Sequence, residues 1–185
     1  MLIAMAGLPA TGKTSLAVRL AGELDGVVLS KDGVRAALFP PPVLDYSREQ
    51  DDLCMAAIYG AAAHILRTSP RRAVILDGRT FLRSYQVQDV LALAASVGQA
   101  PLIIECVCAN EVAKERLERD LARGEHPAAN RTFALYLELQ AAAKPITVPH
   151  LVLDTGELSS EECLTRCVAF LRGYGSSGAV TSESG

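Results

Sequence analysis

Residues 7 to 14 read Gly7-Leu8-Pro9-Ala10-Thr11-Gly12-Lys13-Thr14, and they carry the strongest structural signal in the chain. It has the pattern Gly-x-x-x-x-Gly-Lys-Thr, follows the apolar run Leu2–Ala6 and opens a segment of helical spacing at Lys13. A strand before the pattern and a helix after it are the context that a phosphate-binding loop requires. The glycines let the backbone curl so that its N–H groups point inward, and the helix adds its positive dipole end. The stretch therefore predicts a loop that binds nucleotide phosphates.

Each residue of this P-loop has an expected part in binding a nucleoside triphosphate. Lys13 supplies a point charge to the β and γ phosphates, and the Thr14 hydroxyl is expected to ligate Mg²⁺. Asp77 ends the apolar run Ala73–Asp77, at the sheet edge where a second carboxylate would hold the same ion. The alternative for Asp77 is a cap on the next helix or turn. The predicted nucleotide-binding residues of the loop are Gly7, Pro9, Ala10, Thr11, Gly12, Lys13, Thr14 and Ser15.

Strand and helix patterns alternate along the rest of the chain. Short apolar runs of strand length predict strands at Leu2–Ala6, Val27–Ser30, Ala73–Asp77, Leu102–Val107 and His150–Leu153. Longer segments with helical spacing predict helices at Lys13–Leu24, Arg48–Thr68, Tyr85–Val97, Glu111–Arg123, Arg131–Ala143 and Glu161–Arg172. The alternation predicts the α/β class, with a parallel sheet, right-handed crossovers and helices on both faces.

Composition limits the number of domains and the partners. The 185 residues suit one domain, which we place at 1–172, and the Gly- and Ser-rich residues 173–185 are expected to form a disordered tail. A formal net charge of −3 provides no basic field for duplex nucleic acid. The apolar start lacks the cationic residues of a signal peptide and is too short to span a membrane, so we expect a cytoplasmic protein. The five scattered cysteines are expected to be reduced and buried.

A second acidic residue follows the second predicted strand. Asp32 lies in Ser30-Lys31-Asp32-Gly33-Val34-Arg35, beside the P-loop if this strand joins the same sheet. A carboxylate there would accept the proton of a hydroxyl that attacks the γ-phosphate, and Arg35 would share its helical face. The alternative is that Asp32 only caps the helix that contains Arg35. Lys31 would either lower the pKa of Asp32 or point to solvent.

Four segments carry a family resemblance: Gly7–Thr14, Ser30-x-Asp32-x-x-Arg35, Asp77-x-x-Thr80 and Glu115–Arg123. Together they resemble the P-loop kinases of the polynucleotide-kinase, zeta-toxin and chloramphenicol-phosphotransferase group. The members of this group are AAA-type P-loop kinase-like domains. The resemblance runs from about Leu2 to Thr155. It implies a three-layer P-loop NTPase fold with a five-stranded parallel sheet of order 2-3-1-4-5 and a helical lid at about 116–134. It also implies ATP as the phosphoryl donor, Asp32 as the base and Arg35 as a contact to the substrate or phosphoryl group.

The expected lid carries three arginines. Arg116, Arg119 and Arg123 have spacings that place them on one side of a helix before the break at Gly124. We expect Arg116 to bind the nucleotide and Arg119 and Arg123 to clamp the phosphates when the lid closes. The alternative is that these arginines form only the solvated face of an amphipathic helix.

Three functions remain open from the sequence. The first is a small-molecule kinase, in which segment 33–69 forms a pocket for a hydroxyl acceptor; Arg79 and Arg83 could also face this pocket. The second is a polynucleotide 5′-hydroxyl kinase, which favours more basic residues and stacking aromatics than the segment contains. The third is a nucleotide-driven switch or regulatory ATPase. Asp32 with Arg35 favours a kinase, and the mixed charge of the segment favours a small acceptor. Members of the resembling group act on sugars, antibiotics, nucleotide sugars and nucleic-acid ends, so the acceptor and the oligomeric state stay open.

Overall fold

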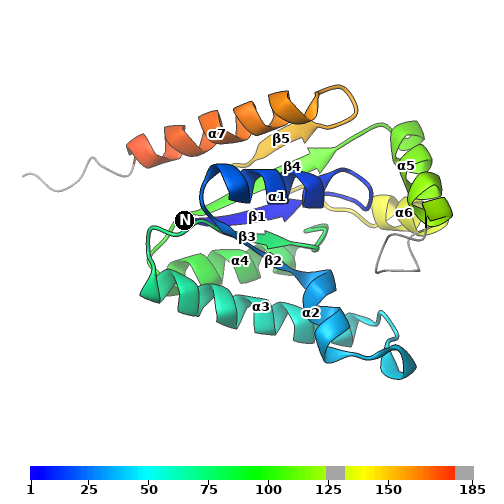
Figure 1. Ribbon diagram of the computed structural model, residues 1–185, viewed down its shortest axis with the longest axis horizontal. Coiled ribbons are helices and arrows are strands. Elements are labelled where there is room, and N and C mark those ends of the chain that lie inside the picture. Colours follow the sequence, from blue (N-terminus) through cyan, green and yellow to red (C-terminus); the bar gives the residue numbers. More distant parts are fainter. Residues whose placement is uncertain (124–131, 178–185) are drawn as a thin grey trace, which may run out of the picture.

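A parallel sheet of five strands forms the centre of the computed structural model, which describes residues 1–123 and 132–177 (Figure 1). The strand order is β2-β3-β1-β4-β5, and every neighbouring pair is parallel. This confirms the predicted class and the order that the family resemblance implied. The strand bounds are β1 Leu2–Ala6, β2 Val27–Ser30, β3 Val74–Asp77, β4 Pro101–Val107 and β5 Leu151–Asp154.

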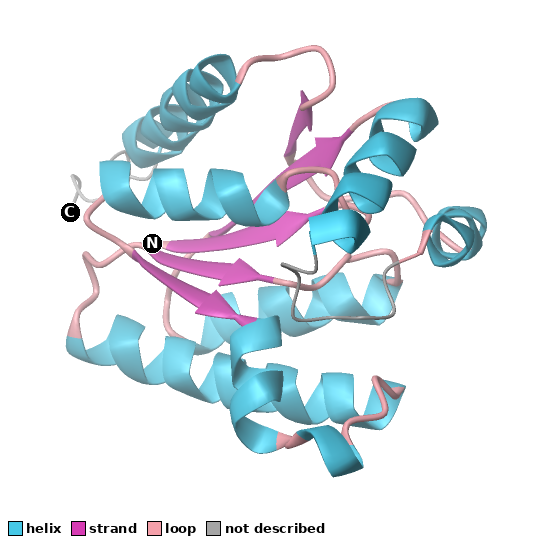
Figure 2. Cartoon of the chain, turned by 45° about the vertical axis from the view of Figure 1, so that its right-hand side comes forward, coloured by secondary structure: helices cyan, strands magenta, loops and turns pink. Residues whose placement is uncertain are grey.

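Helices cover both faces of the sheet, as Figures 1 and 2 show. The continuous apolar run of β1 explains this arrangement, because successive side chains point to opposite faces. Leu2, Ala4 and Ala6 pack in the core under α3 and α4, whereas Ile3 and Met5 pack in the core under α1 and α7. These helices are α1 Lys13–Glu23, α3 Arg48–Thr68, α4 Ser84–Ser96 and α7 Ser160–Ser177.

The remaining helices lie at the carboxyl end of the sheet (Figure 1). They are α2 Lys31–Leu38, the 3₁₀ turn η1 Pro41–Val43, α5 Asn110–Arg123 and α6 Phe133–Ala141. Tyr136 of α6 and Leu117 of α5 share a small core against Leu8 and Ala10, so the arginine-bearing helix packs directly on the P-loop. The carboxyl edge of the sheet is therefore surrounded by loops and short helices on both sides of β1.

Helix α2 contains Arg35, as expected, although the sequence analysis gave it no bounds, and its first turn corrects one alternative for Asp32. The cap is Ser30, whose Oγ accepts a hydrogen bond from the backbone N–H of Gly33 at 3.3 Å. Asp32 is the second residue of the helix and is not its N-cap. The alternative in which Asp32 serves only as a cap is therefore wrong.

The last helix corrects the predicted start of the tail. Helix α7 continues to Ser177, five residues beyond the predicted helix end at Arg172. Leu171 is buried, and the rings of Phe170 and Tyr174 meet edge to face with centroids 4.9 Å apart, so an apolar contact continues past Gly173. Residues 178–185 of the predicted tail and residues 124–131 of the predicted lid lie outside the described residues.

All five cysteines are unpaired; four are buried, as the sequence predicted, whereas Cys108 is partly exposed. Among residues 1–123 and 132–177, no helix combines the length and the hydropathy needed to span a membrane.

Candidate active site

The P-loop adopts a curl that only glycine allows at its first position. Gly7 has a φ of +127°, and a Cβ atom placed there would lie 2.1 Å from the carbonyl oxygen of Cys106. Gly12, with a φ of +81°, directly precedes α1. Inside the loop, the Thr11 hydroxyl donates a hydrogen bond to the carbonyl oxygen of Leu8 at 2.8 Å. The loop is thus held open in front of the α1 N-terminus, which is the geometry that binds phosphate.

A cation and two oxygen-bearing side chains meet at the mouth of this loop. Lys13 is buried, and its ammonium group donates a hydrogen bond to the Leu8 carbonyl oxygen. The Thr14 hydroxyl donates to Asp77 Oδ2 at 2.8 Å. Asp77 Oδ1 is buried and has no hydrogen-bond partner among the described residues. A hydroxyl oxygen beside a carboxylate with one unused oxygen is the donor set that suits Mg²⁺.

Two cavities open on either side of Lys13 and Thr14. The first has a volume of about 540 Å³ and lies between the P-loop, α5 and the start of α7; the residues that line it include Lys13, Thr14, Arg116 and Thr155. The second has a volume of about 310 Å³ and is lined by residues of α2, α3, α4, α6 and the loop after β3. Lys13 and Thr14 line both cavities. A phosphoryl group held by these two residues would face both spaces.

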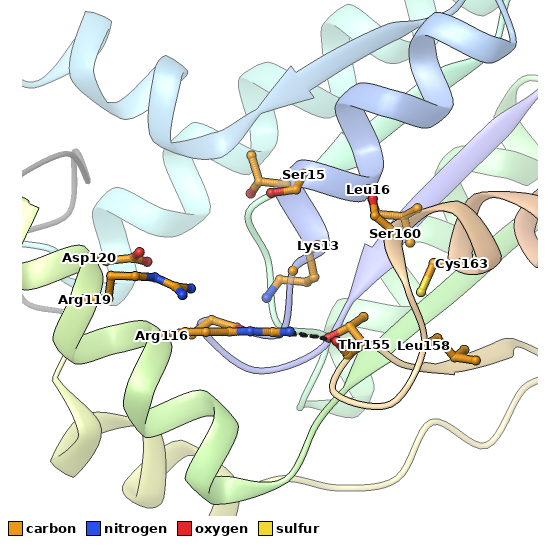
Figure 3. A pocket seen from close by; sticks show the side chains of 13 residues that line it. Lys13, Ser15, Leu16, Arg116, Arg119, Asp120, Thr155, Leu158, Ser160 and Cys163 are labelled. Carbon is orange, nitrogen blue, oxygen red and sulfur yellow. Dashed lines mark hydrogen bonds between the residues drawn. The ribbon is translucent and has the colours of Figure 1, made fainter.

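The first cavity contains two of the predicted lid arginines, as Figure 3 shows. Arg116 donates to the carbonyl oxygens of Ala10 at 3.2 Å and Thr155 at 2.7 Å. Arg119 also lines the cavity, and its side chain points toward Lys13 across the space (Figure 3). Arg123, the last residue of α5, is not among the residues that line it. The structure thus brings Arg116 and Arg119 to the P-loop and leaves Arg123 outside the cavity.

Sequence reasoning missed Thr155, which joins three parts of this cavity. Its hydroxyl donates to the carbonyl oxygen of Thr11 at 2.9 Å and accepts from Arg116 at 3.0 Å. A Cβ atom at Gly12 would lie 3.6 Å from the Thr155 hydroxyl oxygen, so the two backbones are close. Thr155 follows the last strand and belongs to no motif; its position just after a strand at the carboxyl edge was the only signal.

The second cavity contains Asp32 and Arg35. Asp32 Oδ1 lies 3.3 Å from Arg35 Nη1, and the Asp32 side chain retains 26% of its exposure whereas that of Arg35 retains 6%. Arg35 also forms an ion pair with Asp51, and its guanidinium lies 5.3 Å from the centre of the Tyr46 ring. Arg35 is therefore fixed from several sides, while Asp32 keeps access to the cavity.

Lys31 does not point to solvent, which was one of the two alternatives that the sequence left open. Its ammonium group forms an ion pair with Asp51 at 3.0 Å, and its side chain is only 12% exposed. Burial, together with the nearby charge of Arg35, lowers the pKa of Lys31 to about 8, and the charge of Asp32 acts in the opposite direction. Lys31 thus belongs to a buried charge cluster in which Asp51 contacts both Lys31 and Arg35.

Arg79 and Arg83, which follow Asp77 in the sequence, both line the second cavity, as do Arg48 and Tyr85. Arg79 is buried and donates to Asp52 at 2.6 Å and to the Tyr85 hydroxyl at 3.2 Å. The sequence analysis suggested that Arg79 and Arg83 could face the acceptor pocket, and it gave no signal for Tyr85. These residues meet because the loop after β3 lies beside the N-terminal turns of α3 and α4.

Comparisons with known proteins agree with this geometry. A family model described as "AAA domain" matches residues 2–145. No curated protein matches the sequence. Among solved structures, a protein of Chloroflexus aurantiacus J-10-fl that is provisionally named a kinase is 25% identical, with a TM-score of 0.72 over 93% of this chain and 96% of that chain.

Two more distant structures share the fold. A gluconokinase of Sinorhizobium meliloti 1021 is 16% identical, with a TM-score of 0.64 over 94% of this chain and 96% of that chain. Kti12 of Chaetomium thermophilum, solved with ADP-AlF₃, is 20% identical, with a TM-score of 0.66 over 91% of this chain and 98% of that chain. The fold of this chain is that of the P-loop kinases.

Proposed function

This chain belongs to the AAA domain family, and we propose that it is an ATP- and Mg²⁺-dependent kinase that transfers the γ-phosphoryl group to a hydroxyl of a small molecule. One observation carries the proposal: Lys13 and Thr14 line two cavities at once, and Asp32 lines the second. ATP in the first cavity would present its γ-phosphate to a hydroxyl in the second. A regulatory ATPase has no need for the second cavity or for a carboxylate inside it.

The proposed reaction uses the residues on either side of this junction. The acceptor oxygen forms a bond to the γ-phosphorus, the bond between that phosphorus and the β–γ bridging oxygen breaks, and ADP leaves. Asp32 accepts the acceptor's hydroxyl proton, and Lys13 stabilises negative charge on the phosphoryl oxygens. Arg35 contacts the acceptor or the phosphoryl group that is transferred to it. Thr14 and Asp77 would hold Mg²⁺, which would supply positive charge to neutralise the phosphates.

The lid arginines have separate parts in the proposal. Arg116, anchored to Ala10 and Thr155, binds the nucleotide in the first cavity. Arg119 reaches the phosphates from α5, and Arg123 joins it only when the lid moves toward the P-loop. Both arginines would then add positive charge around the transferring group as water is excluded.

A metal titration tests the proposed ligands Thr14 and Asp77. Thr14→Ala and Asp77→Ala should each raise the Mg²⁺ concentration at half-maximal rate by about tenfold or more, because each removes an oxygen partner of the ion. Thr68→Ala, at the exposed end of α3, is the matched control and should leave the titration unchanged. The thermal midpoint is measured alongside, because Asp77 is buried. An unchanged Mg²⁺ requirement in both site variants would remove these residues as ligands.

A screen with γ-labelled ATP tests the function itself. Pooled sugars, polyols, nucleosides, aminoglycosides and a 5′-hydroxyl oligonucleotide are incubated with the protein, and the compound that gains label is identified. We expect a small hydroxyl compound to be labelled at a rate well above that of ATP hydrolysis. Label on the oligonucleotide alone would instead support the polynucleotide kinase, and hydrolysis without transfer would support the regulatory ATPase.

A further inference from the structure

The acceptor cavity, which we define as the 310 Å³ space beside Asp32, is more basic than the sequence of segment 33–69 indicated. Besides Lys13, the cationic residues that line it are Lys31, Arg35, Arg48, Arg79 and Arg83, against only Asp32 and Asp51. Lys31, Arg79 and Arg83 come from outside that segment, which is why the mixed charge of the segment was misleading. The charge facing an acceptor is thus set by residues from several elements.

Ion pairs divide these cations into two groups. Lys31 and Arg35 are matched by Asp51 and Asp32, so that half of the cavity is balanced. The other half holds Arg48, Arg79 and Arg83, and the described carboxylates near it are Asp52 and Asp89. Asp52 lies 2.6 Å from Arg79 and 3.7 Å from Arg48, and Asp89 lies 3.8 Å from Arg79. Among residues 1–123 and 132–177, three cations therefore meet two carboxylates in this half, which leaves one positive charge in excess.

Arg83 is the cation without a counter-charge. It is exposed, lines the acceptor cavity and has no ion pair within residues 1–123 and 132–177. Its neighbour Arg79 is 4% exposed, and its Nε has no hydrogen-bond partner in the same described part of the chain. The charge of Arg79 is matched by Asp52 and Asp89, so the unmatched charge at this wall of the cavity is that of Arg83, and a bound anion would supply its counter-charge.

Tyr85 contacts two of the three arginines of this half, Arg48 and Arg79. The guanidinium carbons of Arg48 and Arg79 lie 5.1 and 5.3 Å from the centre of its ring, and its hydroxyl contacts Arg79 at 3.2 Å. Arginines fixed by a ring and by carboxylates lose little side-chain freedom when a ligand binds. Their planar forks match the oxygens of a carboxylate or a phosphate.

Resting on the proposed function, we propose that the acceptor is a hydroxy compound that carries an anionic group, a carboxylate or a phosphate, bound between Arg79 and Arg83. Its hydroxyl would then lie at the Asp32 side of the same cavity. At roughly 30 Å³ per water, the cavity has room for about ten waters, so the acceptor is of the size of a sugar acid or a sugar phosphate.

Matched acceptors test this charge preference. The probes are glycerol, glycerate and glycerol 3-phosphate, and ribose, ribonate and ribose 5-phosphate, each assayed for kcat/KM with ATP. We expect the better anionic member of at least one set to exceed its neutral parent by about tenfold or more, the usual effect of a charged hydrogen bond. Comparing the carboxylates glycerate and ribonate with the phosphates glycerol 3-phosphate and ribose 5-phosphate shows which anion is preferred. Neutral parents that react as well as both anionic members in every set would overturn the proposal.

Arg83→Gln tests the residue without removing a buried group. The ratio of kcat/KM for the anionic over the neutral acceptor should fall by about tenfold. Arg67→Gln makes the same charge change on an exposed residue of α3 outside the cavity, and the ratio should not change. Equal ratios in wild type and Arg83→Gln would exclude Arg83 as the anion contact.

A binding measurement separates this proposal from the kinase function. Thermal midpoints are measured for wild type and Arg83→Gln with ADP and each acceptor. The anionic acceptors, which are glycerol 3-phosphate, ribose 5-phosphate or the matching acids, should raise the midpoint of wild type more than that of Arg83→Gln. If no acceptor gains phosphate but this difference is seen, the kinase function fails and the anion site stands. If neutral and anionic probes stabilise both proteins equally, the anion site fails whatever the turnover.

Discussion

Lys13→Ala is expected to lower the rate of phosphoryl transfer by at least about 10²-fold and to leave the fold intact. Lys13 lines both cavities, so its ammonium group would face a phosphoryl group that passes from one to the other. Charge that develops on the phosphoryl oxygens would lose this stabilisation. The apolar cores on the two faces of the sheet do not include the Lys13 side chain, so the thermal midpoint should change little.

The measurement compares wild type and Lys13→Ala for label transfer from γ-labelled ATP, nucleotide affinity and thermal midpoint. Lys144→Ala, which removes an exposed lysine that lines neither cavity, is the control and should behave as wild type. Weaker ATP binding together with lost transfer agrees with the proposed role. A Lys13→Ala protein that turns over at a near-normal rate would disprove the proposed P-loop chemistry.

The strands of the sheet could be predicted from the sequence because each is marked by a run of apolar residues that are adjacent in the chain. The bounds of β1 and β2 match the predicted runs Leu2–Ala6 and Val27–Ser30, since buried parallel strands are continuous apolar runs. The P-loop was found for a similar reason. The position of Gly7 and Gly12 in one short motif, between a strand and a helix, is enough to fix the curl of the backbone.

The acceptor cavity could not be predicted in the same way, because it depends on contacts between residues far apart in the sequence. Arg35 meets Asp51, and Arg79 meets Asp52 and Tyr85, through the packing of α2, α3 and α4 at one edge of the sheet. No spacing rule predicts such pairs. Helix α2 was given no bounds because it has only eight residues and contains Gly33, which weakens a helical pattern.

These contacts change what Asp32 can be expected to do. Its neighbour Lys31 is turned to Asp51, and its helix is capped by Ser30, so Asp32 is held mainly by Arg35 on one oxygen. The side chain keeps part of its exposure in the acceptor cavity. A carboxylate that is held in place on one oxygen and keeps its other oxygen for a ligand is suited to receive a proton from a bound hydroxyl.

Asp32→Asn should therefore lower turnover by about 10²–10⁴-fold while nucleotide affinity and the thermal midpoint stay near those of wild type. Asparagine keeps the shape of the side chain and an oxygen for Arg35, and Ser30 still caps α2. Only the basicity is removed. If the protein were a switch without an acceptor, its basal ATP hydrolysis would hardly change, because no acceptor proton has to be removed.

The assay compares transfer to the acceptor found in the screen, basal hydrolysis and ADP binding. Asp25→Asn, which makes the same change on an exposed residue at the far end of the sheet from both cavities, should match wild type in all three. Transfer by Asp32→Asn within about threefold of wild type would exclude Asp32 as the base, since general-base catalysis is worth far more. If Asp32→Asn loses transfer but keeps its basal ATP hydrolysis, Asp32 acts on the acceptor and not on the nucleotide. This is expected because the proton that Asp32 receives comes only from the acceptor.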